Sequence, residues 1–376
     1  MTNLFDYLLW RGDLTLEQSP FQDVDALIFS CLAYHYFDEV LNQYDPTPVT
    51  IFDLAQRIRD LPQEKLHMRD SKDVVLLQLM AKSERYKNMQ VCFYVDHVNE
   101  EKEAQFSAIT ILLGDGSAFI AYRGTDLTLI GWKEDFNMTF LDFVPAQIAA
   151  AGYVLFVAER LKGKIRLGGH SKGGNLAVFA AAVSPKKIQA RITCVYNHDA
   201  PGFQEGMLRF LGYRDIVPKV YSFVPQSSII GMLMNCQGGY TVIKSAEKGL
   251  MQHDPYSWEV SGKDFVRLES ISAESKFWDK TLKNWLVALT PDKREKFVDA
   301  LFEILSMTHS DEKGEVVISP LNAYKTLQTL KDESDDTKKV IFEGLRLLWL
   351  SARKTAEEYG LPLQGLAEFK LLDIKR

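Results

Sequence analysis

Apolar residues recur along this chain with a helical period in its first and last parts, and as short continuous runs between them. Residues 24–37 and 71–82 carry apolar side chains three and four positions apart, which is the spacing of a helix with one buried face. Thr50 precedes another such segment and, with Asp53 three positions later, approximates a helix capping box. The helical period returns near residue 270, with segments at 278–289, 294–307 and 340–359.

Between residues 90 and 260 the apolar runs are too short for most helices and predict strands. The sequence Gly-Asp-Gly-Ser at 114–117 is a turn between two of them, and helices are expected at 145–161 and 174–183. Nearly wholly apolar strands that alternate with helices predict an α/β fold, with a mostly parallel sheet covered on both faces. The expected strands are 91–95, 108–112, 118–122, 164–168, 192–196 and 220–224, with short β-like segments near 240–244 and 257–260.

These changes of pattern predict three regions. We expect a helical N-terminal region at 1–88, packed on the core and without a catalytic residue. An α/β core follows at 89–269. A helical region at 270–376 is either a C-terminal subdomain or an extension that wraps the sheet, and the acidic run at 332–336 is expected to be a solvated turn.

The sequence Gly-His-Ser-Lys-Gly at 169–173 lies between a predicted strand and a predicted helix. Strand, G-x-S-x-G and helix in this order are typical of a nucleophile elbow, in which the serine sits on a sharp turn. Ser171 is therefore the candidate nucleophile. Gly169 and Gly173 are expected because a Cβ atom there would collide with a neighbouring strand or helix. The alternative is a glycine-rich turn with a spectator serine.

A serine hydroxyl needs a general base, and in proteins with this elbow the acid and then the histidine follow the serine in the chain. Three of the seven histidines follow Ser171. We prefer His253, which lies on a polar, proline-containing loop late in the α/β region; its alternative is a surface histidine beside a turn. His198 is the reserve candidate, and His309 is more typical of a helix end.

The candidate acid is Asp199, because it directly follows the first strand after the elbow helix and so emerges at the same sheet edge as Ser171. Its alternative is a turn initiator before Pro-Gly. Asp254 is too close to His253 in sequence to be a favourable partner, and Asp215 precedes its strand, which places it at the opposite edge.

An oxyanion hole needs two N–H groups that converge on one point. Lys172, directly after the nucleophile, supplies one backbone N–H. Thr125, in the loop that leaves the strand at 118–122, is the candidate for the second, with its hydroxyl as a further donor. We expect Asp135 to pair with Arg123 and hold this loop; its alternative is a solvent-facing acid in a first helical turn.

Three segments in this order resemble the class 3 lipases: Arg-Gly-Thr at 123–125, Trp-Lys-Glu-Asp at 132–135 and Gly-His-Ser-Lys-Gly-Gly at 169–174. A closer resemblance is to the bacterial Mbeg1-like proteins, whose pattern includes Ser-Lys-Gly-Gly-Asn-Leu-Ala at 171–177, Asp-Ala-Pro-Gly-Phe at 199–203 and His-Asp-Pro-Tyr-Ser-Trp at 253–258. The resemblance covers most of the chain to about residue 260.

This resemblance implies an α/β-hydrolase fold with Ser171, Asp199 and His253 as a catalytic triad, and an ester or lipid-like acyl substrate that would bring the protein into transient contact with a membrane surface. The chain departs from the class 3 lipases in one place. They usually carry the acid after the next strand, where this chain has Pro-Gln-Ser-Ser at 225–228 and no carboxylate. Either Asp199 takes the role or the triad is degenerate.

The composition of the chain argues against several other classes of protein. A formal charge of −6 argues against a general nucleic-acid surface, and four cysteines without close spacing suggest neither a metal site nor a disulfide framework. No cofactor is implied. The start of the chain lacks the basic and apolar parts of a secretory signal, and no run is long enough for a membrane span, so we expect a cytoplasmic protein. The leading hypothesis is a serine esterase or lipase-like hydrolase; the alternative is an inactive binding or scaffold protein on the same fold.

Overall fold

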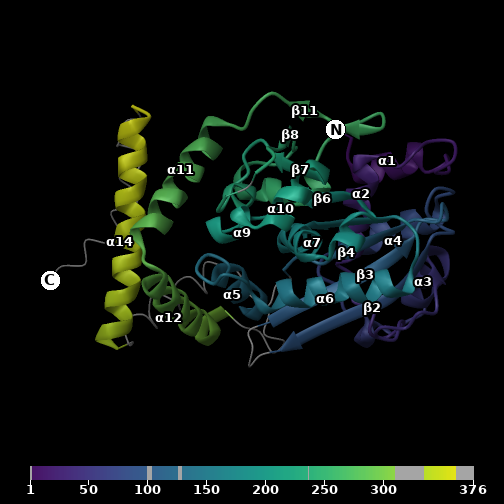
Figure 1. Cartoon of the computed structure of the whole chain (residues 1–376), viewed down its shortest axis with the longest axis horizontal. Coiled ribbons are helices and arrows are strands. Elements are labelled where there is room, and N and C mark those ends of the chain that lie inside the picture. The colour runs from purple at the N-terminus through teal and green to yellow at the C-terminus, as the bar shows by residue number, and fades with distance from the viewer. Residues whose placement is uncertain (1, 100–103, 126–128, 236, 310–333, 361–376) are drawn as a thin grey trace.

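A mixed β-sheet runs through the centre of the computed structural model (Figure 1). The structure describes residues 2–99, 104–125, 129–235, 237–309 and 334–360. Within these residues the main sheet has nine strands, in the spatial order β1-β2-β3-β4-β5-β6-β7-β8-β11. Their bounds are β1 Val49–Thr50, β2 Gln90–Asn99, β3 Ala104–Leu112, β4 Ala118–Tyr122, β5 Ile165–His170, β6 Ile192–His198, β7 Val220–Pro225, β8 Thr241–Ile243 and β11 Arg267–Leu268.

The strands from β4 to β8 run parallel, whereas β1 to β4 pair antiparallel and β11 is antiparallel to β8. Gly169 of β5 lies between Tyr122 of β4 and Asn197 of β6 in the ladder. The carboxyl ends of these strands therefore meet at one edge of the sheet. This is the edge at which open α/β sheets carry their sites, and the topology is that of an α/β-hydrolase-like fold.

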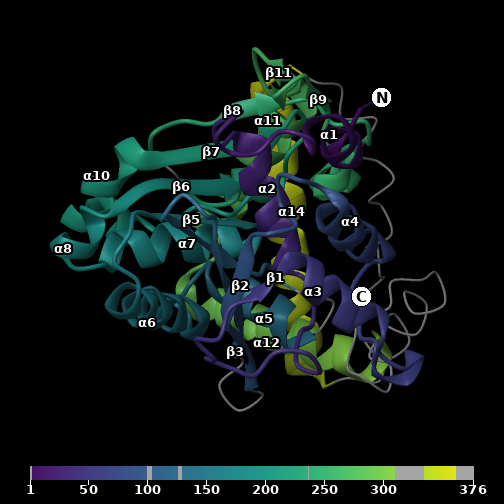
Figure 2. The same ribbon diagram turned by 90° about the vertical axis from the view of Figure 1, so that its right-hand side faces the viewer.

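Helices cover both faces of the sheet because successive residues of each strand point to opposite sides. On β4, Phe119 and Ala121 belong to the apolar cluster beneath the N-terminal helices, and Ile120 and Tyr122 belong to the cluster beneath α6 and α7. Figures 1 and 2 show the two layers. The first layer contains α1 Leu4–Arg11, α2 Asp23–Leu32, α3 Ile51–Arg59 and α4 Ser71–Lys82, and the second contains α6 Pro145–Arg160, α7 Lys172–Val183 and α10 Leu211–Ile216.

Shorter elements connect these layers and shape the loops at the carboxyl edge. Two of them, α5 and η4, carry candidate site residues. The short elements are α5 Leu129–Asn137, α8 Lys186–Gln189, α9 Glu205–Arg209, the 3-10 turns η1 Gln63–Lys65, η2 Val217–Lys219, η3 Ile230–Met232, η4 Gly249–His253 and η5 Pro255–Ser257, and a two-stranded ribbon of β9 Val260–Ser261 and β10 Asp264–Phe265.

The C-terminal helices α11 (Ala273–Ala288), α12 (Pro291–His309) and α14 (Asp335–Glu358) stand on the left of Figure 1, where α14 packs on the other two. The beginning of α11 is tied to the loop after β7, because Ser272 donates its N–H to the Gln226 carbonyl at 2.7 Å. The helix α12 is tied to α5 by an ion pair between Asp299 and Lys133 at 2.8 Å. These helices thus join two loops of the carboxyl edge.

Most elements predicted from the sequence are present in the structure. The helix expected at 24–37 ends at Leu32, and the β-like segment expected near 257–260 begins in the 3-10 turn η5 and reaches a strand only at Val260. Thr50 caps α3 by accepting the N–H of Asp53 at 3.0 Å. The helix α11 begins at Ala273, five residues earlier than expected. The region expected to be helical before residue 90 also supplies the edge strand β1. Of the acidic run expected to be a turn, 332–333 lie outside the described residues, and Asp335 and Asp336 form the first turn of α14.

A buried ion pair anchors α2, the helix that leads into the site. Asp25 and Arg85 have no exposed side-chain surface, and Arg85 Nε and Nη2 lie 2.8 and 2.5 Å from the two Asp25 carboxylate oxygens. Tyr7 and Tyr86 also donate to this carboxylate, and the burial and charge of the site raise the pKa of both phenols.

We predict that Arg85→Met lowers the free energy of unfolding by about 3–5 kcal/mol, because it leaves the Asp25 carboxylate buried without its cation. Urea titration followed by circular dichroism measures this change. The exposed pair of Arg209 and Glu205 provides the control, and Arg209→Met should change the free energy by no more than about 0.5 kcal/mol. Equal effects of the two substitutions would contradict the anchoring role of Arg85.

Candidate active site

Ser171 lies on the sharp turn between β5 and α7, with φ 57° and ψ −136°. A residue other than glycine rarely adopts this conformation, and it persists only where the surroundings enforce it. Two backbone hydrogen bonds do so: Ser171 N–H donates to the His198 carbonyl at 2.9 Å, and the Ser171 carbonyl accepts from Gly174 N–H at 2.9 Å. The turn therefore has the strained geometry expected of a nucleophile elbow.

The glycines around Ser171 leave no room for a side chain. A Cβ atom on Gly169 would lie 2.2 Å from the Gly173 carbonyl carbon, and one on Gly173 would lie 2.1 Å from the Tyr122 carbonyl oxygen. The elbow thus packs backbone against backbone between two strands and a helix. This is the collision that the sequence predicts for these two positions.

His253 and Asp199 meet at the carboxyl edge, at the end of η4 and directly after β6. His253 Nδ1 lies 2.7 Å from Asp199 Oδ2. A carboxylate can only accept, so Nδ1 carries the hydrogen, and Nε2 is the nitrogen that can accept a proton from another group. Asp199 is 1% exposed and has φ 54°, and its N–H donates to the Phe223 carbonyl at 2.8 Å. A buried, fixed acid that orients an imidazole is the arrangement that makes Nε2 a general base.

Ser228 fills the place after β7 where the class 3 lipases carry their acid. Its hydroxyl donates to Asp199 Oδ1, and its oxygen accepts the Gly231 N–H at 3.0 Å. Both Asp199 oxygens are therefore hydrogen-bonded, one to His253 and one to Ser228. A Cβ atom on Gly231 would lie 2.3 Å from Asp199 Oδ1, so this glycine lets the loop close over the carboxylate. From the sequence we noted only that this segment lacks a carboxylate, and we predicted no role for Ser228.

No hydrogen bond joins Ser171 Oγ to His253, or to any other part of the chain that the structure describes. The two residues are linked instead through His170, which precedes Ser171 and whose ring centroid lies 4.5 Å from that of His253. His170 Nε2 donates to the His253 carbonyl at 2.7 Å, and His170 Nδ1 accepts from the Tyr34 hydroxyl at 2.9 Å. Burial holds the pKa of His170 well below its usual range, so its ring is neutral and both contacts are satisfied.

The loop after β4 crosses directly over the elbow. A Cβ atom on Gly124 would lie 2.5 Å from the His170 carbonyl oxygen and 3.1 Å from Ser171 Cβ. The next residue, Thr125, donates its hydroxyl to Asp135 Oδ2 on α5. The contact with Asp135 thus fixes Thr125 directly after the glycine that crosses the Ser171 turn.

The predicted pairing of Arg123 with Asp135 is wrong. Arg123 instead binds Asp96 of β2 through both terminal nitrogens, at 2.6 and 2.7 Å. The register explains this, because Arg123 N–H donates to the Ser107 carbonyl and Ser107 lies opposite Asp96 in the β2–β3 ladder. Arg123 is therefore anchored to the antiparallel edge, and Asp135 is left to hold Thr125.

The side chain of Lys172 is buried together with an acidic partner. Its Nζ lies 2.9 Å from Glu134 Oε2, and the two side chains are 1% and 0% exposed. From the sequence we assigned a role to the backbone N–H of Lys172 and to Asp135. We assigned none to the Lys172 side chain or to Glu134. The sequence signal that could have predicted this contact is a lysine in the second variable position of the elbow together with adjacent acids upstream.

The reserve candidate, His198, lies in buried surroundings beneath the site. His198 is fully buried, its Nδ1 lies 3.3 Å from both the Ser30 hydroxyl and the Gly169 carbonyl, and burial lowers its pKa to about 3. Asp254, set aside because of its closeness to His253, forms an ion pair with Lys72 at 2.6 Å. His309 ends α12, as its sequence context predicts, and its side chain is not among those described.

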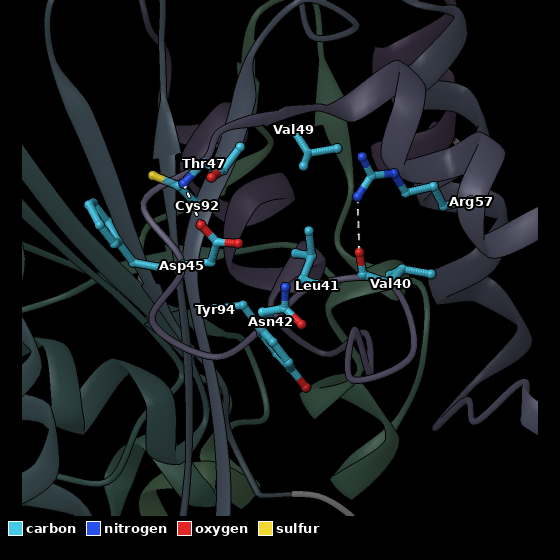
Figure 3. Close-up of a pocket in the computed structure, with 10 residues that line it drawn as sticks. Val40, Leu41, Asn42, Asp45, Thr47, Val49, Arg57, Cys92 and Tyr94 are labelled. Carbon is cyan, nitrogen blue, oxygen red and sulfur yellow. Dashed lines mark hydrogen bonds between the residues drawn. The ribbon is translucent and has the colours of Figure 1, made fainter.

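Two cavities are lined by described residues of the antiparallel part of the sheet and of the elements beside it. The smaller, of about 220 Å³, lies between β1, β2 and α3, where Arg57 donates to the Val40 carbonyl at 3.1 Å (Figure 3). The larger, of about 680 Å³, is mostly apolar and runs along α6 beside Phe106 and Tyr153. Neither is lined by a residue of the proposed triad.

Among the described residues, no group of three or more histidine, cysteine or acidic side chains is placed to hold a metal ion. None of the described helices has the length and apolar character needed to cross a bilayer.

Comparison with solved structures gives weak similarity to lipases. The M37 lipase is 14% identical with a TM-score of 0.38, covering 58% of this chain and 71% of that one. The Lip2 lipase of Yarrowia lipolytica is 14% identical with a TM-score of 0.31, covering 47% and 82%. The lipase of Rhizopus microsporus var. chinensis is 14% identical with a TM-score of 0.32, covering 58% and 85%. The fold assignment above therefore rests on the sheet topology.

Comparison with curated proteins finds no match. The model of the Mbeg1-like family matches residues 80–303, which is more than half of the chain and includes the elbow, Asp199 and His253. The chain belongs to the Mbeg1-like family.

Proposed function

We propose that this protein is a serine hydrolase that cleaves a carboxylic ester or thioester through an acyl-enzyme. The observation that carries the proposal is the hydrogen bond between His253 Nδ1 and Asp199 Oδ2, formed at the same sheet edge as the strained turn of Ser171. A buried carboxylate, an oriented imidazole and a serine on a nucleophile elbow together are the parts of acyl-transfer catalysis.

In this mechanism His253 Nε2 takes the proton of Ser171 as Oγ attacks the acyl carbon. Asp199 keeps the imidazole in the correct tautomer and stabilises its charged form. The backbone N–H groups of Lys172 and Thr125 receive the developing oxyanion. His253 then protonates the leaving alcohol or thiol, and water, activated by the same imidazole, clears the acyl-enzyme. Formation of the Ser171–His253 hydrogen bond on substrate binding is part of the proposal, because such contacts are often long in free enzymes.

The proposed substrate class is an acyl ester with a lipid-like chain, which the resemblance to class 3 lipases implies. Neither a cofactor nor a metal ion takes part in this scheme. The Mbeg1-like pattern contains the nucleophile, acid and histidine segments together, and this supports applying the scheme to this chain.

A second candidate function is a binding or scaffold protein that has kept the fold without the activity. One observation favours it: Ser171 Oγ makes no hydrogen bond to His253 in the described structure. Chemical labelling separates the two functions.

We predict that a fluorophosphonate probe labels the wild-type protein and that Ser171→Ala abolishes the labelling, because only an activated serine reacts with it. Gel fluorescence and intact mass measure the adduct. Ser261, which is exposed on β9, provides the matched control, and Ser261→Ala should be labelled like the wild type. A folded wild-type protein that stays unlabelled would favour the scaffold function.

We predict that Asp199→Asn lowers the rate of labelling by about 10³–10⁴-fold, because an amide stabilises the wrong tautomer of His253 and cannot balance its charge. Stopped-time labelling measures this rate. Asp215→Asn is the control, because Asp215 pairs with Lys186 away from the site, and its rate should match the wild type. A rate reduced less than about tenfold in Asp199→Asn would exclude Asp199 as the triad acid.

A further inference from the structure

Lys172 is fixed from two sides by groups that leave its ammonium no freedom. Its Nζ lies 2.9 Å from Glu134 Oε2 and 3.2 Å from the Gln105 carbonyl. Glu134 in turn accepts the backbone N–H of Gln105 at 3.0 Å and of Ala146 at 2.9 Å. The pair thus connects the elbow helix α7 to α5, to the start of β3 and to the start of α6. Burying two charges is costly unless their donors and acceptors are satisfied. Lys172 and Glu134 meet this condition by pairing with each other and with neighbouring backbone groups.

This arrangement places a positive charge next to the carboxylate that holds the oxyanion loop. Asp135 follows Glu134 on α5, and its Oδ1 lies 3.9 Å from Lys172 Nζ. Its Oδ2 accepts the Thr125 hydroxyl, whereas Oδ1 is buried and has no hydrogen-bond partner among the described residues. Lys172 therefore faces two carboxylates, one of which it binds tightly and one of which it only approaches.

We propose, on the basis of the proposed function, that the Lys172 side chain is a positioning group for the oxyanion loop. Fixed by Glu134, its charge keeps Asp135 an acceptor, and Asp135 holds Thr125 beside Ser171. One residue thus supplies an oxyanion donor through its backbone and orients the opposite donor through its side chain.

The charges around Asp135 agree with this role. The Asp135 side chain is 31% exposed, but its Oδ1 atom is buried. Burial is the largest influence and raises the pKa of Asp135 to about 6, and Glu134 acts in the same direction. Lys172 opposes the shift most strongly among the nearby groups, followed by the hydrogen bond from Thr125, and His253 also opposes it.

Groups on other elements complete the surroundings of Asp135. From the turn after α2, the Tyr34 phenol faces the site, and burial keeps it protonated by raising its pKa. On the α12 side, Lys133 is already paired with Asp299 at 2.8 Å. Lys172 is therefore the cation whose removal changes Asp135 most.

The sign of each charge gives opposite predictions for two variants. Lys172→Met removes the positive charge and should raise the Asp135 pKa by about one unit, since an oppositely charged group within about 4–6 Å lowers a carboxyl pKa by 1–3 units. Glu134→Gln removes a negative charge and should lower the Asp135 pKa. Infrared difference spectra of the purified proteins measure the protonated carboxyl band against pH, with Asp135→Asn variants identifying the band.

The rate of fluorophosphonate labelling against pH is the functional readout. Its acidic midpoint should move upward in Lys172→Met and downward in Glu134→Gln. Introduced into Asp135→Asn, where residue 135 has no proton to titrate, Lys172→Met should move the midpoint by less than it does in the wild type. Thermal unfolding identifies any variant that fails to fold. If either Lys172→Met or Glu134→Gln fails to fold, the midpoint measured for the other variant tests the positioning role.

Two results would overturn the positioning role. One is a lower labelling rate in both variants with an unchanged midpoint, which indicates a purely structural ion pair. The other is an equal shift in the presence and absence of the Asp135 carboxyl. If the wild type is not labelled at all, the proposed function fails, and the infrared band alone decides whether Lys172 controls Asp135.

Discussion

The site depends on one backbone constraint: the glycines that surround the turn at Ser171 have no room for a Cβ atom. Gly169, Gly173 and Gly124 all lie so close to neighbouring backbone that a Cβ atom would overlap it. The parallel strands bring three loops to this turn: one with Thr125, one with Asp199 and one that reaches His253. Because backbone packs closely around these glycines, the strain at Ser171 is sustained by packing, and the fold places the candidate site residues around the turn.

Hydrogen bonds from Tyr34, His170 and Ser228 bind these loops to one another. Tyr34 and His170 fix the backbone of His253, and Ser228 fixes Asp199. The anchored helix α2 leads into Tyr34, and α11 is hydrogen-bonded to the segment that carries Ser228. Regions in both the first and the last part of the chain thus support the candidate site through hydrogen bonds.

Much of this was predictable from the sequence, because strands with apolar runs, glycines at a turn and loops after parallel strands follow local rules. The pairing of His253 with Asp199 was predicted from chain order, the sheet edge, the polar loop around His253 and the family resemblance, and the two side chains do meet. The partner of Arg123 did not, because Asp96 is brought opposite by the register of two antiparallel strands and not by nearness in sequence. The roles of Ser228 and of the Lys172 side chain were missed because both depend on buried side-chain geometry that motifs do not specify.

The central claim is that Ser171, His253 and the two backbone N–H groups act on one acyl centre. A crystal structure of the protein after reaction with a fluorophosphonate tests it most directly. The account predicts phosphorus on Ser171 Oγ, with the phosphonyl oxygen about 2.7–3.1 Å from the N–H groups of Lys172 and Thr125, and with His253 Nε2 turned toward Ser171 Oγ. An adduct whose oxygen points to solvent, or one from which His253 remains distant, would contradict it.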